Sequence, residues 1–244
     1  MKKIVLLIAI VSTAMHAFSI SDKVKLGLFA APGASWMKPM GKDISKGVAG
    51  YGMTYGLKIE YYFKDQNYAL STGLYGGMDM GGVKGRDTFT VLSGGKSVVE
   101  RYNTNYIMLP IYLKLKTNAF KDKYILFGEL GGSFVFNVSA RANYSDGINQ
   151  AGTVPPSVVS ISKENVLQNG NEVQKLIPDF RYQVFDFRLS VGGGLEYVIN
   201  DKTSVFFALH YHNGFVNQIR DTSVNPKKDA IVVRNVLLSI GAMF

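Results

Sequence analysis

The sequence predicts an all-β fold, an eight-stranded antiparallel transmembrane up-and-down β-barrel with short periplasmic turns and long extracellular loops. Three observations support this prediction. Eight segments alternate apolar and polar residues with a period of two, which places the two kinds on opposite faces of a strand. Tyrosine, phenylalanine and glycine number 14, 15 and 26, whereas proline numbers only 7. The last segment ends on an aromatic residue, Phe244, which resembles the C-terminal signal read by the barrel-insertion machinery.

The first four predicted strands differ in regularity. They span residues 24–31, 50–62, 68–80 and 103–116. The second is the most regular, because six apolar side chains from Tyr51 to Tyr61 share one face against glycine, threonine and charged residues. The third sets leucines and a methionine against serine, glycine and aspartate. In the fourth, five apolar side chains between Ile107 and Leu115 oppose a tyrosine and two lysines.

The last four predicted strands carry more aromatic residues. They span residues 124–142, 182–199, 204–215 and 230–244. The fifth and sixth alternate leucine, valine and phenylalanine with serine, asparagine, glycine and charged residues. The seventh opposes four apolar side chains to a face that includes two histidines. In the closing strand Arg234 is the one break in an apolar face that ends at Phe244.

The predicted connections alternate in length. The short ones lie near 64–66, at 117–123 and at 200–202, and the long ones at about 32–49, 81–102, 143–181 and 216–229. Short turns on one rim and long loops on the other are typical of transmembrane barrels. An even strand number then places both ends of the barrel at the short-turn, periplasmic rim.

The N-terminal segment predicts export. Lys2 and Lys3 precede an apolar stretch over 4–11, and Ala17-Phe18-Ser19 fits a small-x-small cleavage site. We therefore expect a signal peptide over 1–19 and an outer-membrane barrel domain over 20–244. The alternative, an N-terminal membrane anchor, has an apolar run shorter than the ~20 residues that a span needs. The absence of cysteine fits passage through an oxidising periplasm.

The pattern alone leaves open which face is inside. In a soluble sandwich or lipocalin-type barrel, the apolar face would point inward. Two features favour the membrane barrel instead. The charged face is sparse and glycine-rich, which suits a narrow interior. The apolar face carries aromatics near strand ends, as an interfacial girdle should; these are Tyr51, Tyr61, Tyr68, Tyr197, Tyr211 and Phe244.

The expected inner face carries charges that must pair. These residues are Lys25, Lys58, Glu60, Lys114, Lys116, Glu129, Asp186, Arg188 and Glu196. An eight-stranded barrel is just wide enough for side chains to fill, and buried charges are costly unless paired. We therefore predict an ionic plug, with lysines interleaved between glutamates. The alternative interpretation is a gated proton or ion path.

Four segments resemble the PorT-like family of outer-membrane barrels. Residues 106–116 are similar to its Tyr-x-x-(Leu/Ile)-Pro-(Leu/Ile)-x-Leu-Lys strand, and 192–197 to its glycine-rich sixth strand. Residues 209–217 resemble its Arg-Tyr-x-x-Gly strand end, with His210 in place of the arginine, and 236–244 fit its terminal strand. The resemblance implies an eight-stranded barrel of the OmpA and OmpX kind. It implies little about activity, although the founding PorT protein is linked to a protein-secretion and gliding apparatus.

No catalytic, cofactor or metal site is expected. His210 and His212 share a strand face, but a third metal ligand is not evident. The late strand of lipid A deacylase barrels resembles His-x-Ser-Asn, and here His212 stands at the serine position, so the nucleophile is missing. Thr90 occupies the place of the first glycine that a phosphate loop over 93–97 would need. We expect the 192–194 glycines to make room for large side chains across the barrel.

The net charge of +9 points to an anionic partner. Nucleic acid is not expected for an exported chain, so outer-membrane lipid and the phosphates of lipopolysaccharide are the expected counterpart. The cations that would reach them are Lys38, Lys42, Lys46, Lys84, Arg86, Lys96, Arg101, Arg220, Lys227, Lys228 and Arg234. A protein partner at the extracellular loops or periplasmic rim is a further expectation.

The sequence therefore predicts an integral outer-membrane protein of a Gram-negative cell with a filled lumen and a structural or surface-interaction role through its extracellular loops. We expect it not to be an enzyme. The alternatives are a PorT-like accessory of a secretion or gliding complex and a narrow transport barrel for small apolar molecules. A lipid enzyme would need a nucleophile near the outer rim.

Overall fold

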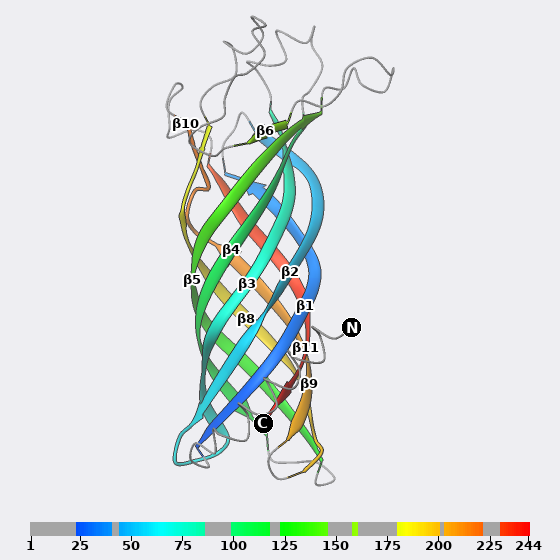
Figure 1. Ribbon diagram of the computed structural model, residues 1–244, viewed down its shortest axis with the longest axis vertical. Coiled ribbons are helices and arrows are strands. Elements are labelled where there is room, and N and C mark those ends of the chain that lie inside the picture. Colours follow the sequence, from blue (N-terminus) through cyan, green and yellow to red (C-terminus); the bar gives the residue numbers. More distant parts are fainter. Residues whose placement is uncertain are drawn as a thin grey trace, which may run out of the picture.

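The computed structural model confirms the eight-stranded antiparallel barrel (Figure 1). It describes residues 23–40, 44–85, 99–117, 123–145, 158–160, 180–200, 203–221 and 230–244. The barrel strands are β1 (Val24–Pro39), β2 (Ile44–Tyr62), β3 (Tyr68–Gly85), β4 (Val99–Lys116), β5 (Tyr124–Ser145), β8 (Phe185–Val198), β9 (Ser204–Gly214) and β11 (Ile231–Met243). Short strands β6 (Val158–Ser160), β7 (Phe180–Tyr182) and β10 (Ile219–Asp221) complete the described structure. Within the described ranges, no helix has the length and apolarity needed to cross a membrane.

The strands pair in the order β4-β3-β2-β1-β11-β9-β8-β5, and a β4–β5 pairing closes the cylinder. Following directly paired positions once around the barrel leads from Leu26 through Ile59 and onward back to β1 at Trp36. This displacement of ten residues along β1 corresponds to a strand tilt of about 40° for eight strands. The steep, long strands in Figure 1 follow from that stagger.

The apolar face of each strand is outside and the charged face is inside. Leu113, Leu189 and Leu238 are 44%, 45% and 55% exposed. By contrast, Lys114 and Arg188 are only 0% and 1% exposed. The orientation predicted from the sequence is therefore correct, and a soluble barrel with an apolar core does not describe this chain.

Exposed aromatic side chains mark both ends of the apolar band on the outer face. Tyr61, Tyr68, Tyr124, Tyr197 and Phe244 lie at the end where β2 turns into β3. On β2, Tyr51 lies ten residues above Tyr61, and both are 45% exposed. Ten residues of a strand tilted by about 40° rise about 25 Å, which matches the apolar band of outer-membrane barrels.

The boundaries of the upper strands differ from the prediction. The expected long connection over 32–49 is wrong, because β1 continues to Pro39 and β2 begins at Ile44. The strands also extend into the predicted 81–102 loop, leaving residues 86–98 between β3 and β4. Alternation weakens there because Pro32 and Ala34 take the outward positions of β1, and register shifts between Lys46, Ala49 and Gly52 interrupt the two-residue period of β2, although the backbone pairing continues.

The two remaining long connections carry the short strands. In the predicted 143–181 loop, β6 pairs with the top of β5. Between the last barrel strands, β10 of the predicted 216–229 loop pairs with β7. The predicted signal peptide over 1–19 and the 93–97 segment lie outside the described residues, as do Lys42, Arg86, Lys96, Lys227 and Lys228.

The outward orientation predicts how the barrel responds to a charge on its outer wall. Leu74 is 54% exposed and lies six residues above Tyr68 on β3, near the middle of the apolar band. Leu74→Arg should lower the free energy of unfolding by about 2–4 kcal/mol, because the charge would face hydrocarbon. Ile199→Arg, in the turn after β8, is the matched control with an expected cost near zero. Urea titration in lipid vesicles measures both, and equal costs would contradict the membrane orientation.

Candidate functional site in the barrel lumen

Six ionisable side chains form a continuous chain of ion pairs in the lower lumen. We call them the lower cluster: Lys58 and Glu60 on β2, Lys114 and Lys116 on β4, Glu129 on β5 and Glu196 on β8. These six side chains all point into the lumen because alternate residues of a strand face inward. The antiparallel register then brings the inward positions of β2, β4, β5 and β8 to a similar height near the periplasmic end.

Positive and negative groups alternate along the lower cluster. Glu129 Oε1 lies 2.5 Å from Lys58 Nζ, which is 3.3 Å from Glu60 Oε1. The same Glu60 oxygen lies 2.6 Å from Lys114 Nζ. Lys114 and Lys116 then both reach Glu196 Oε2, at 3.2 and 3.3 Å. The predicted interleaving of lysines and glutamates is therefore confirmed, with three charges of each sign.

The second carboxylate oxygens of this cluster also have partners. The Tyr62 hydroxyl donates to Glu60 Oε2 at 2.6 Å, and the Ser204 hydroxyl donates to Glu196 Oε1 at 2.6 Å. The Lys114 ammonium lies 4.3 Å from the ring centroid of Phe127. Charges taken out of water are tolerated when hydrogen bonds and opposite charges replace hydration. The lower cluster meets that condition.

Lys25 lies at the periplasmic mouth of the lumen. It is half-buried, and its ammonium lies 5.9 Å above the ring of Tyr62. The sequence placed it on the inner face, and its contact with Tyr62 agrees with that. None of the salt bridges among the described residues includes Lys25, so it lies beside the chain of ion pairs.

A second group of polar side chains, the upper cluster, lies closer to the extracellular end. It consists of the charged Asp79 on β3, Asp186 and Arg188 on β8, and the neutral Asn235 on β11. Arg188 Nη1 lies 2.6 Å from Asp79 Oδ2, and Arg188 Nε lies 2.9 Å from Asp186 Oδ2. The Asn235 amide donates to Asp79 Oδ1 at 2.9 Å. The sequence analysis placed Asp186 and Arg188 inside but omitted Asp79. The signal was available, because Asp79 falls on the inward face of β3 with Ser71.

A layer of histidine, serine and tyrosine separates the two clusters. His210 Nε2 lies 2.9 Å from Glu129 Oε2, and His210 Nδ1 lies 3.0 Å from the Ser239 hydroxyl. His212 Nδ1 lies 2.6 Å from the Ser190 hydroxyl, which continues to Tyr112 at 3.3 Å. The two imidazole centroids are 6.1 Å apart. In the described part of the chain, no group of three or more potential ligands is arranged to hold a metal.

The contacts of His210 place a hydroxyl, an imidazole and a carboxylate in line, as in serine hydrolases. The sequence analysis sought a serine two positions after His210 and missed Ser239, which reaches it across the β9–β11 pairing. Ser239 is 4% exposed. The cavity beside it has a volume of about 20 Å³, which is room for about one water molecule. The geometry therefore suits a hydrogen-bonded relay inside a packed lumen better than acyl-group hydrolysis.

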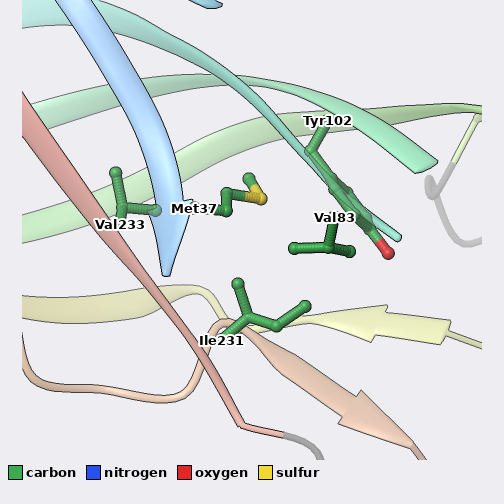
Figure 2. Packing of buried hydrophobic residues seen from close by; sticks show 5 residues of the cluster. All are labelled: Met37, Val83, Tyr102, Ile231 and Val233. Carbon is green, nitrogen blue, oxygen red and sulfur yellow. The ribbon is translucent and has the colours of Figure 1, made fainter. Parts of the chain in front are cut away.

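An apolar cap lies above the upper cluster at the extracellular end. Figure 2 shows its side chains converging from four barrel strands. The cap consists of Met37, Val83, Tyr102, Ile231 and Val233, each no more than 3% exposed. Tyr182 of β7 packs against it. The sequence analysis missed the cap because Met37, Val83 and Tyr102 fall in segments that it assigned to loops.

The fold and the filled lumen define a small integral membrane β-barrel. The chain matches the family described as outer membrane protein beta-barrel domain over residues 17–220, and it belongs to that family. The protein is therefore an integral protein of the outer membrane. A search of the curated proteins finds no match.

Among solved structures, the chain is similar to several outer-membrane barrels. OprG from Pseudomonas aeruginosa is 12% identical over 91% of this chain and 94% of OprG, with a TM-score of 0.46. Ail from Yersinia pestis is 13% identical over 91% and 99%, with a TM-score of 0.35. The protease OmpT from Escherichia coli is 11% identical over 93% and 99%, with a TM-score of 0.40. At these identities the likeness concerns the barrel fold alone.

The alternating lower cluster predicts a large cost for removing its most buried cation. Lys114→Met should lower the free energy of unfolding by about 3–5 kcal/mol, because Glu60 and Glu196 would lose a buried partner. Lys123→Met, in the exposed turn before β5, is the control. Its free energy of unfolding should stay within about 0.5 kcal/mol of the wild-type value. Urea titration of both variants in vesicles tests this, and a similar cost for the two would show that the ion pairs contribute little.

The enclosed position of Ser239 predicts that it does not react as a nucleophile. A fluorophosphonate probe should leave the folded wild-type barrel unlabelled, because the cavity beside Ser239 is too small to admit it. A serine esterase treated in parallel is the positive control. Labelling that disappears in Ser239→Ala would instead identify an active serine and contradict the structural interpretation.

Proposed function

We propose that this protein is a sealed, non-enzymatic outer-membrane barrel that acts through its outer wall and extracellular segments and does not conduct solutes. One observation carries the proposal. Along the described lumen, the lower cluster, the histidine layer, the upper cluster and the apolar cap succeed one another, and the cavity beside the histidine layer has a volume of about 20 Å³. A hydrated ion or a metabolite needs far more room than one water molecule occupies.

The same packing argues against the alternative of a narrow transport barrel. A carrier of small apolar molecules would need a dry pocket, and binding pockets for small molecules usually enclose about 300 Å³ or more. The cavity beside the histidine layer is far smaller, and lysine, glutamate and histidine contribute to its lining. A larger pocket of about 540 Å³ at the lower ends of β4, β5 and β8 is open rather than enclosed. The geometry of the barrel interior therefore supports the proposal of a structural lumen and favours a function at the surface of the barrel.

Three kinds of partner follow for such a barrel. Outer-membrane lipid, including lipopolysaccharide, would contact the outer wall, and the insertion machinery would read the strand that ends at Phe244. A protein partner would bind at the extracellular segments or the periplasmic rim. The PorT-like motif at 106–116, which forms the lower part of β4, supports a secretion or gliding complex as that partner.

The sealed lumen predicts electrical silence. Purified full-length protein in a planar bilayer should show no steady conductance of pore size, because ion-paired and apolar layers block the axis. A trimeric porin reconstituted in the same bilayer provides the positive control. A steady channel from the wild-type protein would refute the proposal.

The PorT resemblance predicts a stable partner. Affinity purification of the tagged protein from gently solubilised membranes should retain a component of a secretion or motility apparatus. A tagged barrel of similar size without the motif is the control. Recovery of the protein alone, under conditions that preserve known outer-membrane complexes, would count against an accessory role.

A further inference from the structure

Charges are segregated between the lumen and the outer wall. Among strand residues whose side chains the structure describes, every carboxylate is buried in the lumen. Toward the extracellular end, six cations lie exposed or half-buried on the strands: Lys38, Lys46, Lys84, Arg101, Arg141 and Arg234. None of the salt bridges found among the described residues involves these six side chains. Among the side chains that the structure describes, the outer face of the upper strands therefore carries positive charge without a carboxylate.

Arg234 lies at the lower edge of this cationic belt. Its neighbours Val233 and Asn235 are each 1% exposed and point into the lumen, so Arg234 points outward. It pairs directly with Trp36 on β1 and with Asn213 on β9. Directly paired side chains have Cβ atoms about 5 Å apart. The outer face thus carries an indole, a guanidinium and an amide in one row.

Two features of this row favour an anionic ligand at the membrane interface. Arg234 Nε is buried but has no hydrogen-bond partner, and an unsatisfied buried donor is costly. Trp36 stacks on Tyr211, with ring centroids 6.4 Å apart and planes at 30°. Tryptophan and tyrosine favour the membrane–water interface, so this row lies at headgroup height. A guanidinium at this depth is stabilised by a phosphate, which it can bind with two parallel hydrogen bonds.

The outer wall is apolar below this row and positively charged above it, which is the order of contacts that a membrane lipid needs. Below it, Ala34, Val236 and Leu238 face outward and offer an apolar strip for an acyl chain. Above it, Lys38 lies two residues beyond Trp36 on the same face of β1. A lipid with an acyl chain, an interfacial phosphate and further anionic groups above would match this order of contacts.

We propose that the outer wall formed by β1, β11 and β9 binds the phosphate of an outer-leaflet glycolipid of the lipid A class, with Arg234 as the principal ligand. Lys38 and Asn213 add a charge and a hydrogen-bond donor, and Trp36 fixes the depth of the headgroup. This site deepens the proposed function by naming a ligand class for the outer wall. It does not depend on the lumen being sealed.

The experiment uses the full-length protein in detergent micelles, titrated with bisphosphorylated lipid A and followed by native mass spectrometry. Arg234→Gln should weaken lipid A binding at least tenfold, because the amide keeps some hydrogen bonding but loses the charge. Lys123→Gln removes the same charge at the periplasmic rim and should change binding less than twofold. Heat-modifiable migration on gels confirms that each variant is folded.

Competitors distinguish the sources of the phosphate. Excess phosphatidylglycerol and millimolar inorganic phosphate should leave lipid A bound to the wild-type protein. Equal displacement by phosphatidylglycerol would overturn the assignment to a glycolipid, and unchanged binding by Arg234→Gln would overturn the site itself. If Arg234→Gln does not fold, Lys38→Gln with Asn213→Ala is the substitute, with the same expected loss. Planar-bilayer recording of the same variants separates a failure of this site from a failure of the sealed-lumen proposal.

Discussion

The alternating chain of ion pairs in the lower cluster is the constraint on which the rest of the structure depends. The barrel turns most of its apolar side chains outward, and among the described residues only three small apolar clusters are buried in its interior. The charged side chains between those clusters must therefore be held by polar contacts. Three lysines and three glutamates balance in charge, and hydroxyl groups satisfy the outer carboxylate oxygens. Each member has partners from other strands, so the network specifies one relative placement of β2, β4, β5 and β8.

The narrow cylinder demands small residues where large polar side chains cross it. A Cβ atom at Gly192 would overlap the ring of His210, the residue that joins Glu129 to Ser239. The predicted role of the glycine run is confirmed at this position. A larger residue there would displace the imidazole and open the histidine layer between the two ionic clusters. The hydrogen bonds of His210 in the lumen therefore depend on glycine at position 192.

Much of the candidate site could be predicted from the sequence, but not its connections. The inward placement of Lys58, Glu60, Lys114, Glu129 and Glu196 follows from the period of each strand. Asp79 was assigned to the polar face of its strand but left out of the predicted inner-face charges, and Ser239 was missed because its partner His210 lies on another strand. The apolar cap escaped because small residues hide the alternation of the upper strands. In the upper strands the backbone pairing continues beyond the segments in which apolar and polar residues alternate.

The sequence alone determined the fold class, the number of barrel strands and which side chains share a face, because a two-residue period separates the two faces without knowledge of any partner strand. The sparse, glycine-rich charged face and the aromatics near strand ends then indicated that the apolar face meets lipid. Only the tertiary structure decided which charges pair, how the lumen is layered and that Arg234 lies beside Trp36 and Asn213. Those contacts depend on the ten-residue stagger of the closed barrel. That stagger is a property of all eight strands together and is encoded in no single segment.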